Sequence, residues 1–229
     1  MAKKKRYYAV VKGRNPGIYT EWKGQNGAQA QIIRFSGSVY KGFETEREAE
    51  EFMNQQSIEQ PDIQETEAAG LKEGKIIIYT DGACINNPGP GGYGVVIKNG
   101  KKTEELSGGY RMTTNNRMEL MACIVGLSAL KKPLSVILFS DSKYVVDGIS
   151  KGWAKRWRSN GWMRTKTEPA VNPDLWEQLL KLCGKHDVRF QWVRGHAGNE
   201  GNERCDELAS KAALGDQLQS DDIYEMNDK

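Results

Sequence analysis

Apolar and polar positions follow regular patterns in two parts of the chain and lose that periodicity in the segments between and after them. In the second and larger part, apolar runs of strand length alternate with stretches whose apolar residues recur every three or four positions. The strands predicted there span residues 75–81, 94–98, 101–107, 135–141 and 188–194, with Asn99-Gly100 as a hairpin turn. The helices predicted there span residues 114–130, 143–148, 174–183 and 202–214. This order predicts an α/β fold with helices on the faces of a sheet.

The first part of the chain is a smaller unit with strand-like composition. Residues 7–12 and 30–35 favour strands, and residues 45–53 form a predicted helix. Thr45 followed by Glu48 is a capping box, in which each side chain bonds a free backbone N–H at the start of the helix. The pattern predicts a β-rich unit with one helix, near the lower size limit for folding without disulfides.

Two segments are too polar to build a core. Residues 54–74 read NQQSIEQPDIQETEAAGLKEG, without an aromatic residue, and predict a flexible linker. Residues 215–229 form an acidic C-terminal tail that we expect to fray, with at most a short helical extension. The sequence therefore predicts two domains, residues 1–53 and 75–214, which are joined by the linker and followed by the tail.

Composition and charge narrow the class of protein. No apolar run reaches the roughly 18 residues of a membrane span, and no apolar signal core follows the first residues, so we expect a cytoplasmic protein without membrane contact. The four Cys include no Cys-x-x-Cys pair and are expected to be reduced, buried thiols. Residues 1–56 and 75–214 carry net charges of +4 and +7, against −4 in each polar segment. A polyanionic partner would explain this distribution, and solvated surface charge is the alternative.

Four carboxylates occupy positions where an ionised group is costly. Asp81 and Asp141 each end an apolar strand, Glu119 lies early in a helix beside Met118, and Asp206 adjoins an apolar helical row. Each one alone is explained as a turn or helix cap. Together, they would repel one another unless hard divalent cations such as Mg²⁺ bind them. Two such ions about 4 Å apart can promote phosphodiester hydrolysis.

Four segments carry a specific resemblance over essentially all of residues 75–214. They read YTDGACINNPGPGGYG (79–94), TTNNRMELMA (113–122), FSDSKYV (139–145) and RGHAGNEGNERCDELA (194–209), and they resemble ribonuclease H of type 1 in family order. The resemblance implies a mixed five-stranded sheet flanked by helices. It implies endonucleolytic cleavage of the RNA strand of RNA/DNA hybrids, with two Mg²⁺ ions during catalysis, Mn²⁺ as a substitute, and 5′-phosphate and 3′-hydroxyl ends. The implied catalytic and metal-binding carboxylates are Asp81, Glu119, Asp141 and Asp206.

Two histidines have different contexts. His196 lies in the glycine-flanked stretch GHAGNEG, and the resemblance implies a catalytic residue of a mobile loop that assists proton transfer or product release. A surface histidine is the alternative for His196. His186 precedes a strand without such a context and is expected to face solvent.

Residues 151–166 combine six basic residues and three Trp without an acidic residue, which favours phosphate attraction beside flat apolar surfaces. A helix pair with inward Trp side chains is the alternative, and both descriptions can hold. The resemblance implies a basic protrusion that binds the DNA strand. The residues expected to contribute are Trp153, Lys155, Arg156 and Trp157.

Recognition of RNA against DNA requires groups that bond the 2′-hydroxyl, and side-chain amides suit this task. Turn chemistry alone is the alternative for Asn86-Asn87-Pro88-Gly89. The resemblance implies a DNA-phosphate pocket at Thr114 and Asn172, although Met112 stands where family members often carry Arg. The residues implied for minor-groove and 2′-hydroxyl contacts are Cys84, Asn87, Asn115 and Asn116.

Residues from about 5 to 53 resemble the hybrid-binding domain that precedes some ribonucleases H, through RYYAVVKGRNPGIYTEW and RFSGSVYKGFETEREAEEFM. This implies a small α/β domain that binds the RNA/DNA hybrid through aromatic and basic side chains. Gly42 stands where family members often carry a second Lys. A folding or dimerising module is the alternative. The implied binding residues are Tyr8, Trp22, Tyr40 and Lys41.

The sequence thus predicts a hybrid-cleaving enzyme that acts as a monomer without a required protein partner. Two rivals remain open. One is a hybrid-binding protein that has lost catalysis, which the intact carboxylates and His196 argue against. The other is a different nuclease of the same fold class, such as a junction resolvase or an integrase, since a shared fold alone does not separate these activities.

Overall fold

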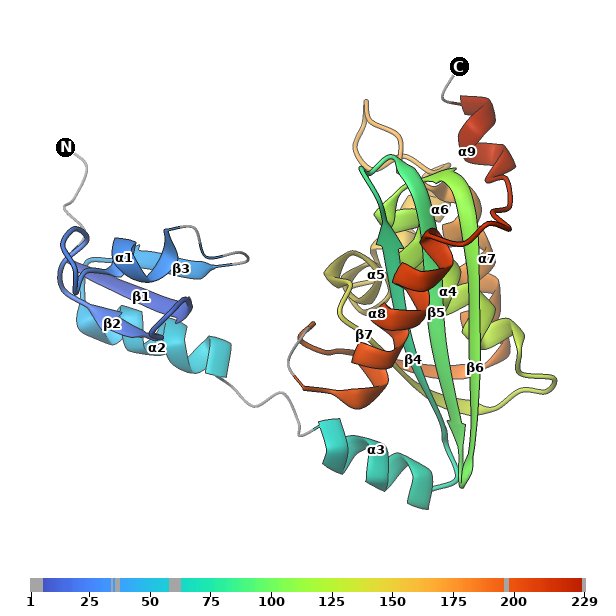
Figure 1. Cartoon of the computed structure of the whole chain (residues 1–229), viewed down its shortest axis with the longest axis horizontal. Helices are drawn as coiled ribbons and strands as arrows, with labels where there is room; N and C mark the ends of the chain where they lie inside the picture. The colour runs from blue at the N-terminus through green and yellow to red at the C-terminus, as the bar shows by residue number, and fades with distance from the viewer. Residues whose placement is uncertain (1–5, 34, 36–37, 58–62, 196–197, 228–229) are drawn as a thin grey trace. The chain divides into compact units, whose positions relative to one another are not determined.

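A computed structural model describes residues 6–33, 35, 38–57, 63–195 and 198–227. The chain divides into two compact units, residues 1–61 and residues 62–229 (Figure 1). Among the described residues, no helix combines the length and apolar character that crossing a bilayer requires.

The N-terminal unit is a three-stranded antiparallel sheet with two helices. The strands pair in the order β2-β1-β3, and the small core contains Ala9, Val10, Ala28 and Ala49. The capping box at the start of α2 is confirmed, because the Thr45 N–H donates to Glu48 (3.1 Å) and the Glu48 N–H donates to the Thr45 hydroxyl (3.3 Å). The elements are β1 (Tyr7–Lys12), β2 (Gly17–Tyr19), α1 (Ala28–Ile32), β3 (Val39–Phe43) and α2 (Glu46–Ser57).

The strand expected over residues 30–35 is wrong for its first part, where α1 ends at Ile32. Ala28 and Gln31 are the buried residues of this helix, and the Gln31 amide donates to the carbonyl of Gly27 (3.3 Å). An apolar run this short fits a strand and a buried helical turn equally well, and packing against β1 decides between them.

The C-terminal unit contains the mixed five-stranded sheet that the sequence predicted. The strand order is β6-β5-β4-β7-β8, in which β4, β5 and β6 are antiparallel and β4, β7 and β8 are parallel. The Asn99-Gly100 turn joins β5 to β6, with Gly100 at φ 59°, a conformation that suits glycine. The strands are β4 (Ile76–Cys84), β5 (Gly89–Asn99), β6 (Lys102–Thr113), β7 (Ser135–Ser140) and β8 (Asp187–Trp192).

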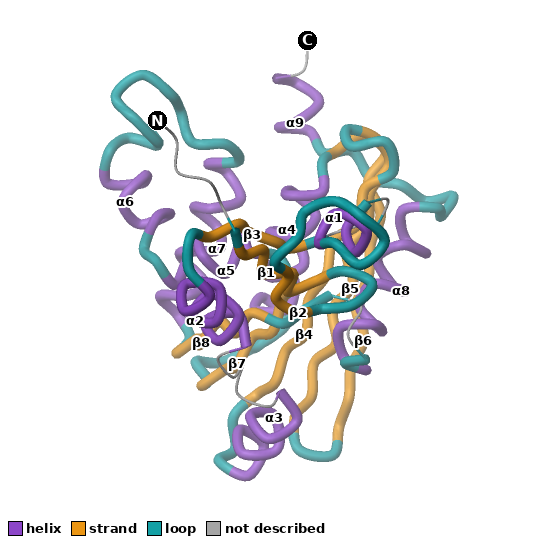
Figure 2. The backbone as a smooth tube through the Cα atoms, turned by 90° about the vertical axis from the view of Figure 1, so that its left-hand side faces the viewer, coloured by secondary structure: helices purple, strands orange, loops and turns teal. Residues whose placement is uncertain are grey.

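Helices cover both faces of this sheet. Alternate residues of β4 face opposite sides, so Ile78 belongs to the larger core with Leu120 and Trp176, and Ile77 belongs to a smaller core with Phe139. Figure 2 shows α5 and α7 on one side of the strands and α8 on the other. The helices are α4 (Asn115–Ser128), α5 (Lys143–Ser150), α6 (Trp153–Ser159), α7 (Pro173–Lys185) and α8 (Glu200–Ala213).

The expected linker is largely helical in the structure. Helix α2 continues to Ser57, and α3 spans Ile63–Lys72. Ile63 and Leu71 pack against the smaller core, and the Glu67 carboxylate accepts hydrogen bonds from the Tyr79 hydroxyl and from Lys98 Nζ, both at 2.6 Å. The segment is poor in apolar residues, yet the few it has meet an apolar sheet face, so tertiary contacts stabilise a helix that composition disfavours.

The C-terminal tail is also more ordered than expected. Gln219 exchanges backbone hydrogen bonds with Gly109 and Arg111 beside β6, and α9 spans Asp222–Asn227. Asp221 is only 5% exposed and pairs with Arg117, which lies in α4. A buried ion pair anchors this segment, and composition carries no signal for such a pair.

The expected environment of His186 is wrong. The side chain is 4% exposed, and neither ring nitrogen has a hydrogen-bond partner among the described residues. Burial, followed by the charge of Lys185, lowers the pKa of His186 below its usual value, so the imidazole is neutral near pH 7. Among the thiols, Cys123 and Cys205 are buried as expected, and Cys84 and Cys183 are only partly buried.

Candidate active site and nucleic-acid interface

Three carboxylates meet at one end of the two central parallel strands. Asp81 lies in β4 and Asp141 directly follows β7, and the two strands pair Thr80 with Ser140. Helix α4 brings Glu119 to the same place. This close approach requires glycine at position 82, because a Cβ there would collide with the Glu119 backbone nitrogen. One oxygen from each of Asp81, Glu119 and Asp141 lies within 4.8 Å of the others.

Burial makes this cluster electrostatically costly. Asp81 is 7% exposed and Glu119 is 6% exposed. Burial, followed by the charge of Asp141, raises the pKa of Asp81 to about 8. Burial, followed by the charges of Asp81 and Asp141, raises the pKa of Glu119 well above its usual value. The buried oxygen Glu119 Oε2 has no hydrogen-bond partner among the described residues. Clustered oxygen donors with an unbonded lone pair fit a hard divalent cation, which would keep the carboxylates ionised.

Asp206 is outside the group of three but belongs to the same electrostatic environment. It lies on α8, is partly exposed, and its charge contributes to the raised pKa of Asp81. The Ser210 hydroxyl donates to Asp206 Oδ1 at 3.4 Å. The structure therefore brings together three of the four predicted carboxylates and leaves the fourth on a separate element at the edge of the site.

The segment expected to carry the catalytic histidine approaches Asp141. A Cβ at Gly195 would collide with the Asp141 carboxylate, so this backbone runs directly against the cluster. Trp192 Nε1 donates to the Asp141 carbonyl at 2.9 Å and fixes the end of β7 from the neighbouring strand. His196 itself lies outside the described residues.

The residues expected to contact the RNA strand gather at the start of α4, next to Glu119. Asn87 Oδ1 accepts the Asn115 N–H at 3.0 Å and ties the β4–β5 turn to the helix. Asn115 Nδ2 donates to Glu119 Oε1 at 3.4 Å, and Asn116 is exposed. Cys84 Sγ lies 3.3 Å from the Thr113 carbonyl. The side-chain amides therefore lie next to the carboxylate cluster but are not part of it.

The two residues of the expected DNA-phosphate pocket start two different helices. Thr114 caps α4, accepting the N–H of Arg117 at 3.4 Å, and Asn172 precedes α7. Sequence reasoning missed the group that connects them. The buried guanidinium of Arg117 donates to Asn172 (3.4 Å), to Asp174 (3.0 and 2.7 Å) and to Asp221 (2.6 and 2.7 Å). An Arg inside an otherwise buried helical stretch was the available signal, because such a charge requires partners.

The basic, Trp-containing region divides into exposed and buried parts along α6. Lys155 and Arg156 are exposed, whereas Trp157 is 8% exposed and packs edge-on against Trp176 with ring centroids 5.9 Å apart. Trp153, the first residue of α6, is half-buried, and Lys151 Nζ lies 5.1 Å from the centre of its ring. The inward packing of Trp157 agrees with the alternative of a helix pair with inward Trp side chains, and the exposed cations leave phosphate binding as a prediction.

The N-terminal unit presents an aromatic surface at its expected binding residues. The Trp22 ring lies between those of Tyr8 (5.1 Å) and Tyr40 (5.5 Å), and Tyr40 is 46% exposed. Lys41 Nζ lies 5.4 Å from the Phe43 ring. A cavity of about 580 Å³ opens beside Tyr8 and Trp22.

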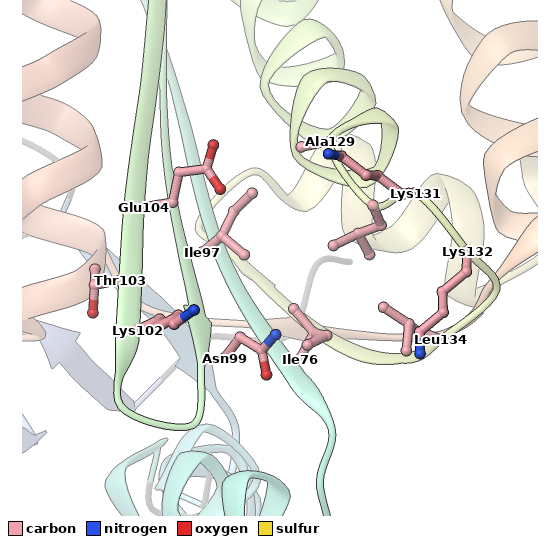
Figure 3. A pocket seen from close by; sticks show the side chains of 11 residues that line it. Ile76, Ile97, Asn99, Lys102, Thr103, Glu104, Ala129, Lys131, Lys132 and Leu134 are labelled. Carbon is pink, nitrogen blue, oxygen red and sulfur yellow. The ribbon is translucent and has the colours of Figure 1, made fainter.

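A cavity of about 590 Å³ lies at the opposite end of the sheet from the carboxylates. Its apolar lining includes Ile76 at the start of β4 and Ile97 near the end of β5. Figure 3 shows Lys102 at the β5–β6 hairpin and Lys131 and Lys132 after α4 around these side chains. Because Asp81 lies toward the other end of β4, this cavity is separate from the carboxylate cluster.

The fold and the site define an α/β protein whose mixed sheet carries a buried carboxylate cluster suited to divalent cations, preceded by a small aromatic-surfaced unit. The sequence profile described as RNase H matches residues 73–214, and that described as Ribonuclease H1 N-terminal domain matches residues 6–53. The chain therefore belongs to the ribonuclease H family, and it is an enzyme of that family.

The similar proteins agree with this placement. Ribonuclease H of Trichodesmium erythraeum is 62% identical over 154 residues, covering 67% of this chain and 98% of the relative. Ribonuclease H of Syntrophus aciditrophicus is 60% identical over 157 residues, covering 69% and 91%. The crystal structure of LC9-RNase H1, a type 1 RNase H with the type 2 active-site motif, superimposes with a TM-score of 0.57 at 30% identity, covering 63% of this chain and 74% of the other.

Proposed function

We propose that this enzyme cuts the RNA strand of RNA/DNA hybrids endonucleolytically, with two Mg²⁺ ions during catalysis and with Mn²⁺ as a substitute. The observation that carries the proposal is the buried group of Asp81, Glu119 and Asp141, with raised carboxyl pKa values and an unbonded Glu119 oxygen. Bound ions would supply an activated water and stabilise the leaving oxygen, leaving 5′-phosphate and 3′-hydroxyl ends. Asp206 would complete the ligand set from α8.

The chain's own residues would orient the hybrid and move protons. Asn87, Asn115 and Asn116, together with Cys84, would read the 2′-hydroxyl beside Glu119, because side-chain amides can both donate and accept. Thr114 and Asn172 would hold a DNA phosphate, with the α6 region along the DNA strand. His196 would assist proton transfer or product release, since a histidine titrates near neutral pH.

The N-terminal unit would hold the hybrid through Tyr8, Trp22, Tyr40 and Lys41, combining stacking with phosphate attraction. Binding by one unit raises the effective concentration of substrate at the other without new contacts. We infer repeated cutting along one hybrid, by a monomer in the cytoplasm that requires no protein partner.

Cleavage of end-labelled RNA/DNA, RNA/RNA and DNA/DNA duplexes of one sequence tests the activity, each with Mg²⁺, Mn²⁺ or a chelator. The carboxylate cluster predicts cutting only when metal is present, and the residues proposed to read the 2′-hydroxyl and the DNA phosphate predict that RNA is cut only in the hybrid. Tight hybrid binding without cutting would favour a protein that has lost catalysis. Cutting of pure or branched DNA would favour another nuclease of this fold class.

Replacing Trp22 and Lys41 together with Ala is expected to raise KM for long hybrids about tenfold and to change kcat less than twofold. The two substitutions remove a stacking ring and a cation and leave the carboxylates intact. Loss of one base–aromatic stacking contact is enough to weaken binding about tenfold. The control is Arg47→Ala, whose side chain is 84% exposed on α2. A defect confined to kcat, or an equal defect in the control, would contradict the binding role.

A further inference from the structure

The C-terminal segment, defined here as residues 215–227, lies beyond the residues that the RNase H profile matches. It is nevertheless held against the catalytic unit. The Gln219 N–H donates to the Gly109 carbonyl (2.8 Å), and the Arg111 N–H donates to the Gln219 carbonyl (2.9 Å). Farther along, the Arg111 guanidinium makes a bidentate pair with Glu225 of α9 (2.8 and 3.1 Å). These contacts fix the segment on both sides of Asp221.

Asp221 reaches into the start of α4. Its Oδ2 accepts the Thr113 hydroxyl at 2.8 Å and Arg117 Nε at 2.6 Å, and its Oδ1 accepts Arg117 Nη2 at 2.7 Å. Thr113 directly precedes Thr114, the cap of α4, and Arg117 lies two residues before Glu119. One carboxylate of the C-terminal segment therefore holds both ends of the stretch that carries Asn115 and Asn116.

Arg117 extends this connection to the second helix of the phosphate pocket. Its Nη1 donates to Asn172 Oδ1 at 3.4 Å, and Asn172 has φ 59° and ψ 44°. Asn is one of the few residues other than glycine that adopt this left-handed conformation readily, so the hydrogen bonds of its amide, and not backbone strain, position its side chain. Asn172 Nδ2 lies 3.5 Å from the Tyr144 hydroxyl, so Arg117 and Tyr144 hold the two ends of its amide.

We infer that Asp221 is a positioning residue for substrate binding: through Arg117 it fixes Asn172 at the start of α7, and with Thr113 it fixes the start of α4. The C-terminal segment is then a working part of the DNA-phosphate pocket. Asp221 is not needed to neutralise Arg117, because Arg117 is also paired with Asp174. This supports a positioning role for Asp221. The second carboxylate adds a fixed direction for the guanidinium, since a bidentate pair constrains the plane of both groups.

The inference rests on the proposed function and has its own test. Asp221→Asn in the full chain is expected to raise KM for the hybrid about fivefold and to leave kcat within twofold, because the pocket is displaced and the carboxylates are not. The matched control is Asp222→Asn, whose side chain is exposed. Kinetics are measured at a temperature where circular dichroism shows every variant folded.

A double-mutant cycle separates positioning from simple destabilisation. If Asp221 acts through Asn172, the Asp221→Asn change should raise KM by a smaller factor in an Asn172→Ala background than in the wild-type chain, and the part that remains reports its contact with Thr113 at the start of α4. Unchanged KM with a lowered melting temperature, or independent multiplication of the two effects, would overturn the inference. Where Asp221→Asn does not fold, Glu225→Gln and Thr113→Val give the same readout, since the first removes the charge and one of the two acceptors that pair with Arg111, and the second removes the hydroxyl that donates to Asp221. Failure of the wild-type chain to cut hybrids would instead refute the proposed function.

Discussion

Asp81→Asn is expected to reduce turnover of RNA/DNA hybrid by at least about 10³-fold while changing the dissociation constant of the hybrid less than about threefold. The substitution keeps the volume of the side chain but removes the negative charge of the most central carboxylate. One oxygen of Asp81 lies within 4.8 Å of oxygens of both Glu119 and Asp141, and the charge of Asp206 also raises its pKa. Without its charge, the remaining carboxylates would hold a divalent cation poorly.

Single-turnover cleavage and hybrid binding in chelator measure these two quantities separately. The matched control is Asp187→Asn, an exposed Asp at the start of β8, beside Ser135 at the end of the sheet away from the cluster. The control is expected to retain wild-type turnover. Full activity of Asp81→Asn would refute the assignment of the cluster, and loss of hybrid binding in parallel with turnover would indicate a structural defect.

The carboxylate cluster could be predicted from the sequence because each acid stands at a position fixed by local pattern. Asp81 ends the apolar run of β4, which continues to Cys84, and Asp141 directly follows β7; because the two strands pair in parallel as far as Thr80 and Ser140, the two acids come together. The position of Glu119 can be predicted from the helical periodicity that buries Leu120. The pattern that predicts the core therefore also places this acid at the border of the core.

The two polar segments could not be predicted in the same way, because their order depends on partners distant in sequence. In α3, Glu67 is held by Tyr79 and Lys98, and Leu71 packs on a sheet face that residues 54–74 do not contain. Asp221 is held by Arg117, which is 104 positions away. Composition measures what a segment can bury by itself, so it underestimates segments that complete the surface of another element.

His186 shows the opposite failure, in which a polar residue near a strand is buried without a local signal. Sequence pattern gives no information about the groups that cover a side chain in the folded protein, and a neutral imidazole is accepted there. The same limit applies to the N-terminal unit, where α1 replaced an expected strand because its partner surface on β1 decides the conformation.

The contribution of Asp81 to the stability of the metal-free protein is expected to fall as pH rises from about 4 to about 8, the window between the usual and the folded-state pKa of this group. A carboxyl whose pKa is raised by folding binds more protons in the folded state than in the unfolded state. The free energy of unfolding contributed by that group is therefore present below the unfolded pKa and is lost as pH rises through the folded pKa. Glu119 acts in the same direction, because burial and its neighbours also raise its pKa.

Asp81→Asn removes this contribution, because the amide cannot ionise, and it also removes the Asp81 charge that helps to raise the pKa of Glu119. In chelator at pH 8, the variant is expected to be more stable than the wild-type chain, by on the order of 2 kcal/mol, whereas at pH 5 the difference should be much smaller. Urea unfolding at both pH values measures the difference, and the N-terminal unit is common to both proteins and cancels. Mg²⁺ should stabilise the wild-type chain more than the variant, and more at pH 8 than at pH 5, because binding requires ionised carboxylates. An equal difference between variant and wild type at the two pH values would mean that Asp81 is ionised across the whole range, and the electrostatic argument for a cation at this cluster would fail with it.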